Sequence, residues 1–128
     1  MLLLDADVLI DVSRNVKPAV AWLYSLDEKP ALPGLVVMEL MKGSRDSSEM
    51  RAAVNLVNYF DFHWPTEKDC RKALEILFYA SLSHNMGVID TLIAAIAIGL
   101  NADLCTFNEK HFKAVPELRI IKPYLGHG

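Results

Sequence analysis

The stretch VIDTLIAAIAIGLNADLCTFNEKHF, residues 88–112, decides the fold of this chain. Residues 92–100 are almost wholly apolar, which predicts a helix buried in the centre of the domain. Residues 103–106 have the pattern of a short strand, and residues 109–112 suit a short helical turn. A buried helix joined closely to a short apolar strand favours a fold in which helices pack on a parallel sheet.

The same alternation continues on both sides of this stretch. Residues 2–4 lack polar alternation, which predicts a strand buried on both faces. Further strands are expected at residues 62–64 and 119–121, with at most a very short one within 30–34. Further helices are expected at residues 5–12, 17–27, 36–42, 48–60 and 66–82. We therefore expect an α/β fold, with a central parallel sheet flanked by helices in three layers (α/β/α).

Several side chains are assigned to helix caps or to the core. Thr66, followed by Asp69 three residues on, forms a near capping box, and Ser47 or Ser48 is expected to cap the helix before it. The long helix after Thr66 is expected to bury a stripe of five apolar residues: Ala73, Leu74, Leu77, Phe78 and Leu82. Trp22 and Trp64 also lie in apolar patterns and are expected in the core.

Composition narrows the class of protein. The chain has 128 residues, 52% of them hydrophobic, and a net charge of −3. This is enough for one domain, which we place at residues 1–125, with a flexible tail at residues 126–128. The mild charge argues against a strongly basic protein that coats polyanions. It does not exclude a nuclease, because a carboxylate metal site is itself acidic.

The chain carries no membrane or secretion signal. The apolar run at its start has no basic region before it and is interrupted by Asp5 and Asp7, unlike a signal peptide. No stretch approaches the ~18 uninterrupted apolar residues of a membrane span. Two cysteines, Cys70 and Cys105, are too few for a disulfide framework and are expected to be reduced thiols in or near the core. We expect a cytoplasmic protein.

Three carboxylates stand out by their positions. Asp5 follows the first strand, Asp90 opens the buried helix, and Glu39 lies in a mostly apolar helix. In a parallel sheet these places share one edge of the molecule, where ligands bind. Carboxylates brought within a few ångströms repel one another unless a cation joins them, and Mg²⁺ or Mn²⁺ suits such oxygen ligands.

Each carboxylate also has an ordinary structural interpretation. Asp5 and Asp90 are well placed to cap the helices that they precede. Glu39 could instead lie on a solvated face and pair with Lys42. These alternatives stay open for each residue taken alone.

Three segments resemble the PIN domain, in particular the VapC-type toxins of bacterial and archaeal toxin–antitoxin pairs. They are LLLDADVLIDV at residues 2–12, VVMELMKGSR at residues 36–45, and the stretch at 88–112, followed by the closing strand. The resemblance covers nearly the whole chain, in order and with natural spacing. It implies an endoribonuclease that depends on Mg²⁺ or Mn²⁺, a small antitoxin partner, and a homodimer.

The resemblance also assigns roles to residues. It implies that Asp5, Glu39 and Asp90 are the metal-binding acids. A fourth acid often follows the strand that here ends in Leu104-Cys105-Thr106, but this chain has Asn108 in that place. Asn108 offers a carbonyl oxygen without a charge, which implies weaker metal binding, particularly at a second ion. Asp103, which precedes the strand, is expected at the opposite edge of the sheet.

A possible RNA-binding rim surrounds these acids. Lys42, Arg45, Lys110 and Lys113 follow Glu39 and Asn108 along the chain and could hold an RNA backbone, although scattered cations also serve solubility. The Thr106 hydroxyl is a further candidate for the site.

Two rival functions are weighed. Asp5-Ala6-Asp7 has the Asp-x-Asp of haloacid dehalogenase-type phosphatases, but Leu9 departs from that pattern and the chain is short for the fold. Asp7 is therefore expected at the edge of the site or as a helix cap. His111 lies near the predicted site and could contact phosphate, but an ordinary surface histidine is the favoured interpretation. The second rival is a catalytically weak or silent PIN-fold binding module, in which Asn108 marks a decayed site.

Overall fold

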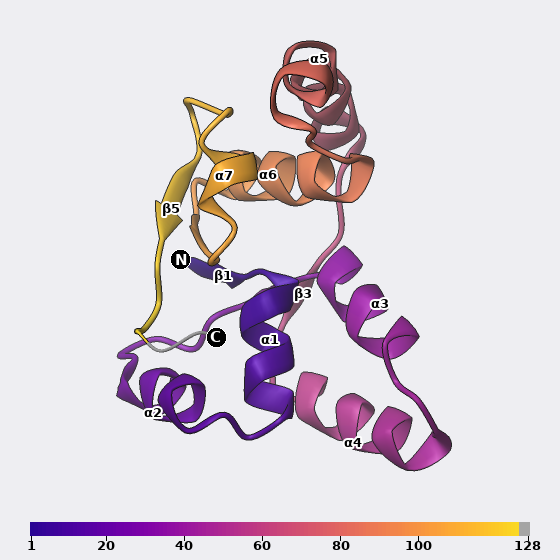
Figure 1. Ribbon diagram of the computed structural model, residues 1–128, viewed down its shortest axis with the longest axis vertical. Coiled ribbons are helices and arrows are strands. Elements are labelled where there is room, and N and C mark those ends of the chain that lie inside the picture. The colour runs from indigo at the N-terminus through magenta and orange to yellow at the C-terminus, as the bar shows by residue number, and fades with distance from the viewer. Residues whose placement is uncertain (126–128) are drawn as a thin grey trace.

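The structure is a computed structural model that describes residues 1–125, and the tail expected at residues 126–128 lies outside them (Figure 1). The strands are β1 (Leu2–Leu4), β2 (Leu32–Pro33), β3 (Phe62–His63), β4 (Asp103–Cys105) and β5 (Arg119–Ile121). The helices are α1 (Ala6–Ser13), α2 (Lys17–Ser25), α3 (Gly34–Lys42), α4 (Ser47–Val57), α5 (Glu67–His84), α6 (Val88–Leu100) and α7 (Glu109–Phe112).

All strand pairs are parallel. β4 lies between β1 and β5 in one sheet, and β2 pairs with β3 in another. A parallel bridge between Leu3 and Ala31 joins the two, with Ala31 N donating to Leu2 O at 2.9 Å and Leu4 N donating to Ala31 O at 3.1 Å. The carboxyl ends of the strands therefore meet at one edge.

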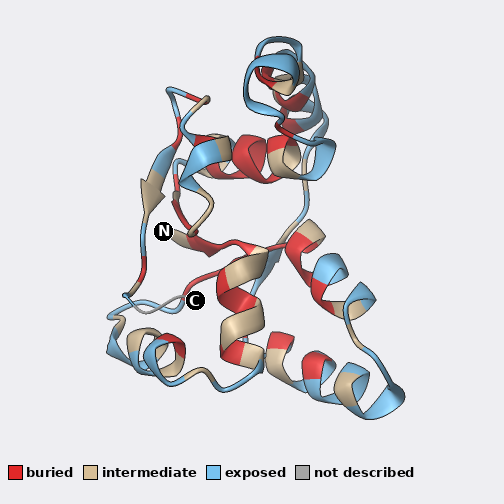
Figure 2. Cartoon of the chain, in the orientation of Figure 1, coloured by how far each residue is buried: buried red, intermediate tan, exposed pale blue. Residues whose placement is uncertain are grey.

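Helices cover both sides of the sheet. In Figure 1, α5, α6 and α7 lie on one side of β1, and α1, α2 and α4 lie on the other. This confirms the expected α/β fold with a parallel sheet flanked by helices. The central positions of β1 and α6 are fully buried, as their unbroken apolar sequences predict (Figure 2).

Local signals explain most helix ends. Thr66 and Asp69 form the expected capping box, with Asp69 N donating to Thr66 Oγ1 and Thr66 N donating to Asp69 Oδ2, each at 3.0 Å. The cap of α4 is Asp46, not Ser47 or Ser48, because its Oδ1 accepts from Glu49 N at 2.8 Å.

The buried stripe expected on α5 is wrong for Leu74, Phe78 and Leu82, which are 68%, 92% and 98% exposed. Ala73 is buried as expected, and α5 packs closely on α6, with Ile76 and Ala80 as its other fully buried apolar residues. The two helices lie close: a Cβ built on Gly99 of α6 would stand 2.5 Å from Asp69 Oδ1. Small residues permit this approach, so the bulky side chains face outward.

Two other core expectations also need correction. Trp64 is 55% exposed, and its ring covers Gly34, where an added Cβ would lie 2.3 Å from a ring carbon. Trp22 is only partly buried and packs near Tyr124, with ring centroids 6.1 Å apart. Cys105 is buried, which raises the pKa of its thiol to about 12, but Cys70 is exposed.

No helix within residues 1–125 is both long enough and apolar enough to cross a membrane.

Candidate metal centre

Four of the residues singled out from sequence line one open pocket at the carboxyl edge of the strands. Asp5 ends β1, Glu39 projects from α3, Asp90 lies in the first turn of α6, and Asn108 follows β4. The pocket has a volume of about 430 Å³, and its other lining residues are Ala6, Asp7 and Phe107. Residues from four separate parts of the chain thus converge here, as the parallel topology predicts.

Asp5 caps a helix, as its structural alternative predicted, and also lines the pocket. It is the N-cap of α1, because its Oδ1 accepts from Ala6 N at 2.8 Å. Its Oδ2 accepts from Thr106 Oγ1 at 2.7 Å, which links the ends of β1 and β4. The carboxylate is only 6% exposed and is held from both sides.

The electrostatics of Asp5 indicate an excess of negative charge. Burial, followed by the charge of Asp7 and then that of Asp90, raises the pKa of Asp5 to about 7, although the bonds from Thr106 and Ala6 act in the opposite direction. The pKa of Glu39 is also raised, by partial burial and then by Asp90 and Asp7. Bringing a cation into the pocket would relieve both effects.

Glu39 is exposed to solvent, as its structural alternative predicted, but it is not paired with Lys42. Within residues 1–125 the structure shows no ion pair between Glu39 and Lys42, and Glu39 lines the pocket with the other acids.

His111 is a site residue that the sequence reasoning did not favour. Its Nδ1 lies 3.2 Å from Asp90 Oδ2 and 3.1 Å from Asn108 Nδ2. With a proton on Nδ1 it donates to Asp90, and without one it accepts from Asn108. The signal was the spacing: His111 follows Asn108 by three residues, so one turn of α7 returns it to the pocket edge.

Asp7 is also at the site. Its Oδ2 accepts from Phe107 N at 3.0 Å and from Thr106 Oγ1 at 3.5 Å, so it binds the turn that follows β4. Of the two positions left open for it, the structure favours the edge of the site, since the helix cap is Asp5.

The expected RNA-binding residues do not line the pocket. Lys42 and Lys110 are exposed on α3 and α7, and Arg45 is paired with Glu49, its Nη2 lying 2.6 Å from Glu49 Oε1. Thr106 is fully buried, which places its hydroxyl behind the carboxylates rather than on the rim. Asp103 lies at the opposite edge, as expected, and pairs with Arg119 at 2.6 Å.

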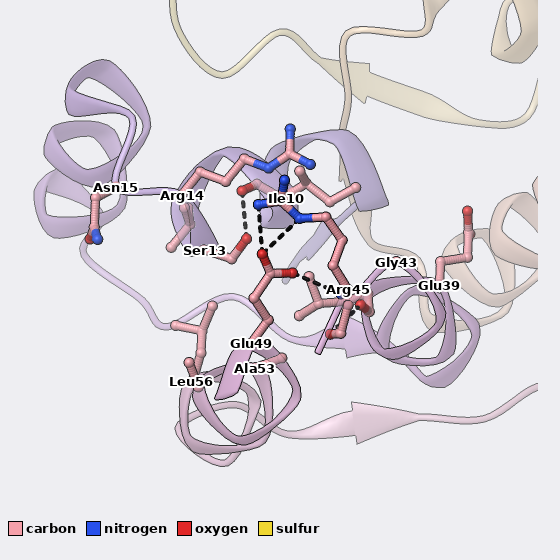
Figure 3. Close-up of a pocket in the computed structure, with 14 residues that line it drawn as sticks. Ile10, Ser13, Arg14, Asn15, Glu39, Gly43, Arg45, Glu49, Ala53 and Leu56 are labelled. Atoms are coloured by element: carbon pink, nitrogen blue, oxygen red, sulfur yellow. Dashed lines mark hydrogen bonds and ion pairs between the residues drawn. The ribbon is translucent and has the colours of Figure 1, made fainter. Parts of the chain in front are cut away.

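A second pocket adjoins the first. It has a volume of about 410 Å³, lies among α1, α3 and α4, and shares Glu39 with the carboxylate pocket. Figure 3 shows Glu49 from α4 pointing toward Arg45, with Ser13 and Arg14 at the end of α1 on the facing wall. We name this second pocket the α1–α3–α4 groove.

The donors of the carboxylate pocket fit a hard divalent cation. All the acids offer oxygen ligands, and burial together with the neighbouring acids raises the pKa values of Asp5 and Glu39. In residues 1–125 no three His, Cys, Asp or Glu side chains yet stand close enough together to hold an ion. Binding therefore requires the acids to draw together around the cation.

Comparisons with known proteins identify the family of the chain. The family described as the PIN domain matches residues 2–118. The chain is 35% identical over 122 residues to ribonuclease VapC10 of Mycobacterium tuberculosis, covering 93% of this chain and 91% of that protein. It is 32% identical over 123 residues to ribonuclease VapC19 of the same organism, covering 93% and 98%.

A solved structure supports the fold. The chain is similar to a protein in a toxin–antitoxin complex from Klebsiella pneumoniae, with a TM-score of 0.80 and coverage of 97% and 98% of the two chains. Their sequence identity is 20%, so this likeness concerns the fold alone.

Proposed function

This chain belongs to the PIN-domain family, among the VapC ribonucleases, and from that membership we propose that it is a metal-dependent endoribonuclease and the toxin of a toxin–antitoxin pair. One observation carries the proposal: Asp5, Glu39 and Asp90 converge on a single open pocket, where burial and neighbouring acids raise the pKa values of Asp5 and Glu39. Residues 1–125 would act as one PIN domain in the cytoplasm.

Asp5, Glu39 and Asp90 would hold Mg²⁺ or Mn²⁺. The cation supplies activated water and neutralises charge on the reacting phosphate. The chain's own contribution is to fix the ligands. Thr106 and Ala6 N hold the two oxygens of Asp5, and His111 holds Asp90. Asn108, with its amide beside His111, is placed to orient water or a phosphate oxygen in the pocket.

RNA would reach the pocket from its open side. Lys42 and Lys110 are exposed near it and would contact backbone phosphates, which supply most sequence-independent affinity. Arg45 would contact RNA only in competition with its partner Glu49.

The antitoxin would dock in the α1–α3–α4 groove. The groove offers apolar side chains such as Leu40 and Leu56 beside Arg14 and Arg45, so it suits a peptide with both apolar and charged groups. Because Glu39 belongs to both pockets, a segment seated in the groove would also cover the metal centre.

A second copy of the chain would pack on the outer face of α5. Leu74, Phe78 and Leu82 are spaced four residues apart, so they form one apolar stripe on that helix. Burying such large exposed side chains favours association.

The test of the proposed function is cleavage of a structured RNA by the purified chain with Mg²⁺, with Mn²⁺ or with EDTA. Asp5→Ala and Asp90→Ala are compared with Asp27→Ala, a matched change at an exposed position outside the pocket. We expect metal-dependent cleavage by the wild type and Asp27→Ala, and a loss of roughly 100-fold or more in the other two variants. Equal cleavage by all variants, or cleavage in EDTA, would contradict the proposal.

The alternative function is a binding module with a weak or silent site. Asn108, a neutral residue at the end of β4, is the observation that favours it. Asn108→Asp separates the two functions: a decayed site would gain cleavage or metal affinity, whereas a working site would change little.

A further inference from the structure

The Asp7 carboxylate is oriented by the turn after β4 rather than by the end of its own helix. Asp7 lies in the first turn of α1, where Asp5 is already the cap. Its Oδ1 accepts from Val8 N at 2.8 Å, and its Oδ2 accepts from Phe107 N at 3.0 Å. A residue one turn into α1 thus fixes the backbone beside Asn108, on the far side of the pocket.

Asp7 is also coupled by charge to the expected metal ligands. It lines the same pocket as Asp5 and Glu39, and the Thr106 hydroxyl lies 2.7 Å from Asp5 Oδ2 and 3.5 Å from Asp7 Oδ2. Together with Asp90, these residues make four carboxylates around one pocket. Two of the four come from the turn that joins β1 to α1.

Asn108 leaves the end of β4 without a charge. Its side-chain amide contacts His111 Nδ1 at 3.1 Å, and its backbone N donates to Thr106 Oγ1 at 3.0 Å. The amide is therefore engaged at the Asp90 side of the pocket, whereas Asp7 brings a negative charge to the Asp5 side.

We infer that Asp7 supplies the fourth negative charge of the metal centre, in the place of an acid at Asn108, and positions the β4–α7 turn for the same site. This inference rests on the proposed function. It makes Asp7 a positioning residue that strengthens cation binding through Asp5 and Glu39. It also explains how the pocket keeps a high negative charge with a neutral Asn108.

The test is the dissociation constant for Mn²⁺, measured by electron paramagnetic resonance or calorimetry on the whole chain without RNA. The variants are Asp7→Asn, Asp7→Asn combined with Asn108→Asp, and Asp11→Asn as the control. Asn at position 7 keeps one oxygen that can accept from Phe107 N, so it removes the charge and keeps the contact with the β4–α7 turn, at the loss of the hydrogen bond from Val8 N. Asp11 is also on α1, but its Oδ2 accepts from Tyr124 Oη at 2.6 Å, and it does not line the pocket.

We expect Asp7→Asn to weaken Mn²⁺ binding by roughly 10- to 100-fold, the range usual for residues that support metal ligands. The double variant should recover most of that loss, and Asp11→Asn should bind as the wild type does. Melting temperatures in EDTA should be no lower in Asp7→Asn than in the wild type, because removing this charge also relieves repulsion among the acids; this separates the effect of charge on metal binding from a loss of fold.

The inference would be overturned if Asp7→Asn bound Mn²⁺ as tightly as the wild type, or if the double variant recovered none of the lost Mn²⁺ affinity. Either result would still be compatible with the proposed metal centre. Absence of Mn²⁺ binding by the wild type would overturn both.

Discussion

The Asp5 carboxylate accepts hydrogen bonds on both oxygens and still has a raised pKa. Hydrogen bonds to a carboxylate stabilise its charged form, so burial and the neighbouring acids must outweigh them. Repulsion among the acids therefore destabilises the folded chain without metal, and a bound cation would reduce that repulsion. This has a consequence for the metal-free protein.

The stability of the metal-free protein should fall as the pH rises. Asp5 has a pKa of about 7 in the folded chain against 3.8 as its ordinary value. Below about pH 4 both folded and unfolded chains hold the proton, and no penalty exists. Between the ordinary pKa of Asp5 and its pKa in the folded chain, only the unfolded chain releases the Asp5 proton. The free energy of unfolding should therefore decrease by at most about 4 kcal/mol up to pH 7.

Urea denaturation in EDTA from pH 4 to pH 8 measures this dependence. Asp5→Asn, which cannot ionise, should show a clearly flatter profile. Identical slopes for the wild type and Asp5→Asn would contradict the assigned electrostatics.

The Thr106 hydroxyl should matter for both stability and activity. It is fully buried, donates to Asp5 Oδ2, and accepts from Asn108 N. Thr106→Val keeps the shape and leaves both partners unsatisfied, which should cost about 1–3 kcal/mol in unfolding free energy and lower RNA cleavage. Thr106→Ser should restore most of each loss. A Thr106→Val variant with wild-type stability and cleavage would show that the bond is dispensable.

The positions of the acids could be predicted from the sequence more accurately than the contacts that they make with neighbouring residues. The positions of Asp5 and Asp90 could be predicted, because strand ends and helix starts share one edge of a parallel sheet, whereas Glu39, in the middle of α3, was singled out by its apolar neighbours and the family resemblance. The contact between His111 and Asp90 could not, since it depends on how α7 turns back over the pocket. The orientation of Asp7 likewise depends on the backbone at Phe107, which residue spacing does not reveal.

At the scale of elements, α6 was predictable and α5 was not. A helix that is almost wholly apolar is buried on all its faces, so the burial of α6 could be predicted without knowing which face packs on the sheet. α5 carries apolar residues on two sides, and size rather than hydrophobicity decides which side faces α6. The close approach selects Ala73 and Ala80, which periodicity alone does not distinguish from Leu74 and Phe78.

Gly99→Ala tests this close approach. The new methyl group would lie 2.5 Å from Asp69 Oδ1, the carboxylate of the α5 capping box. We expect a loss of about 1–3 kcal/mol in unfolding free energy as the helices separate or Asp69 moves. Gly87→Ala is the matched control, because nothing lies within 4 Å of its added Cβ and its φ of −86° suits alanine. Equal stability of the two variants in thermal unfolding would contradict the packing described.

At the scale of the whole molecule, the surface has an acidic region and an apolar region in different places. The acids gather in one pocket at the carboxyl edge of the sheet, whereas three strongly exposed apolar side chains, Leu74, Phe78 and Leu82, lie along one face of α5. The acidic pocket suits a cation and RNA, and the apolar face of α5 suits contact with another protein surface. The family resemblance implied a homodimer, but only the structure locates an apolar face that fits one.

Phe78→Glu should produce a monomer without unfolding the chain. The side chain is 92% exposed, so its replacement should change the melting temperature of the monomer little, but a charge would disrupt the apolar stripe. Sedimentation velocity of the wild type and variant measures the mass of each. Tyr24→Glu, at an exposed position on α2, is the matched control and should remain dimeric. A monomeric wild type, or a dimeric Phe78→Glu, would contradict the assigned surface.

The most direct test of the account is a crystal of the chain soaked in Mn²⁺, examined by anomalous diffraction. The account predicts a manganese peak in the pocket among Asp5, Glu39 and Asp90, with the carboxylates drawn closer together than in the metal-free chain. A pocket without manganese at saturating concentration, or an ion bound only elsewhere, would contradict the proposal that these acids form a metal centre.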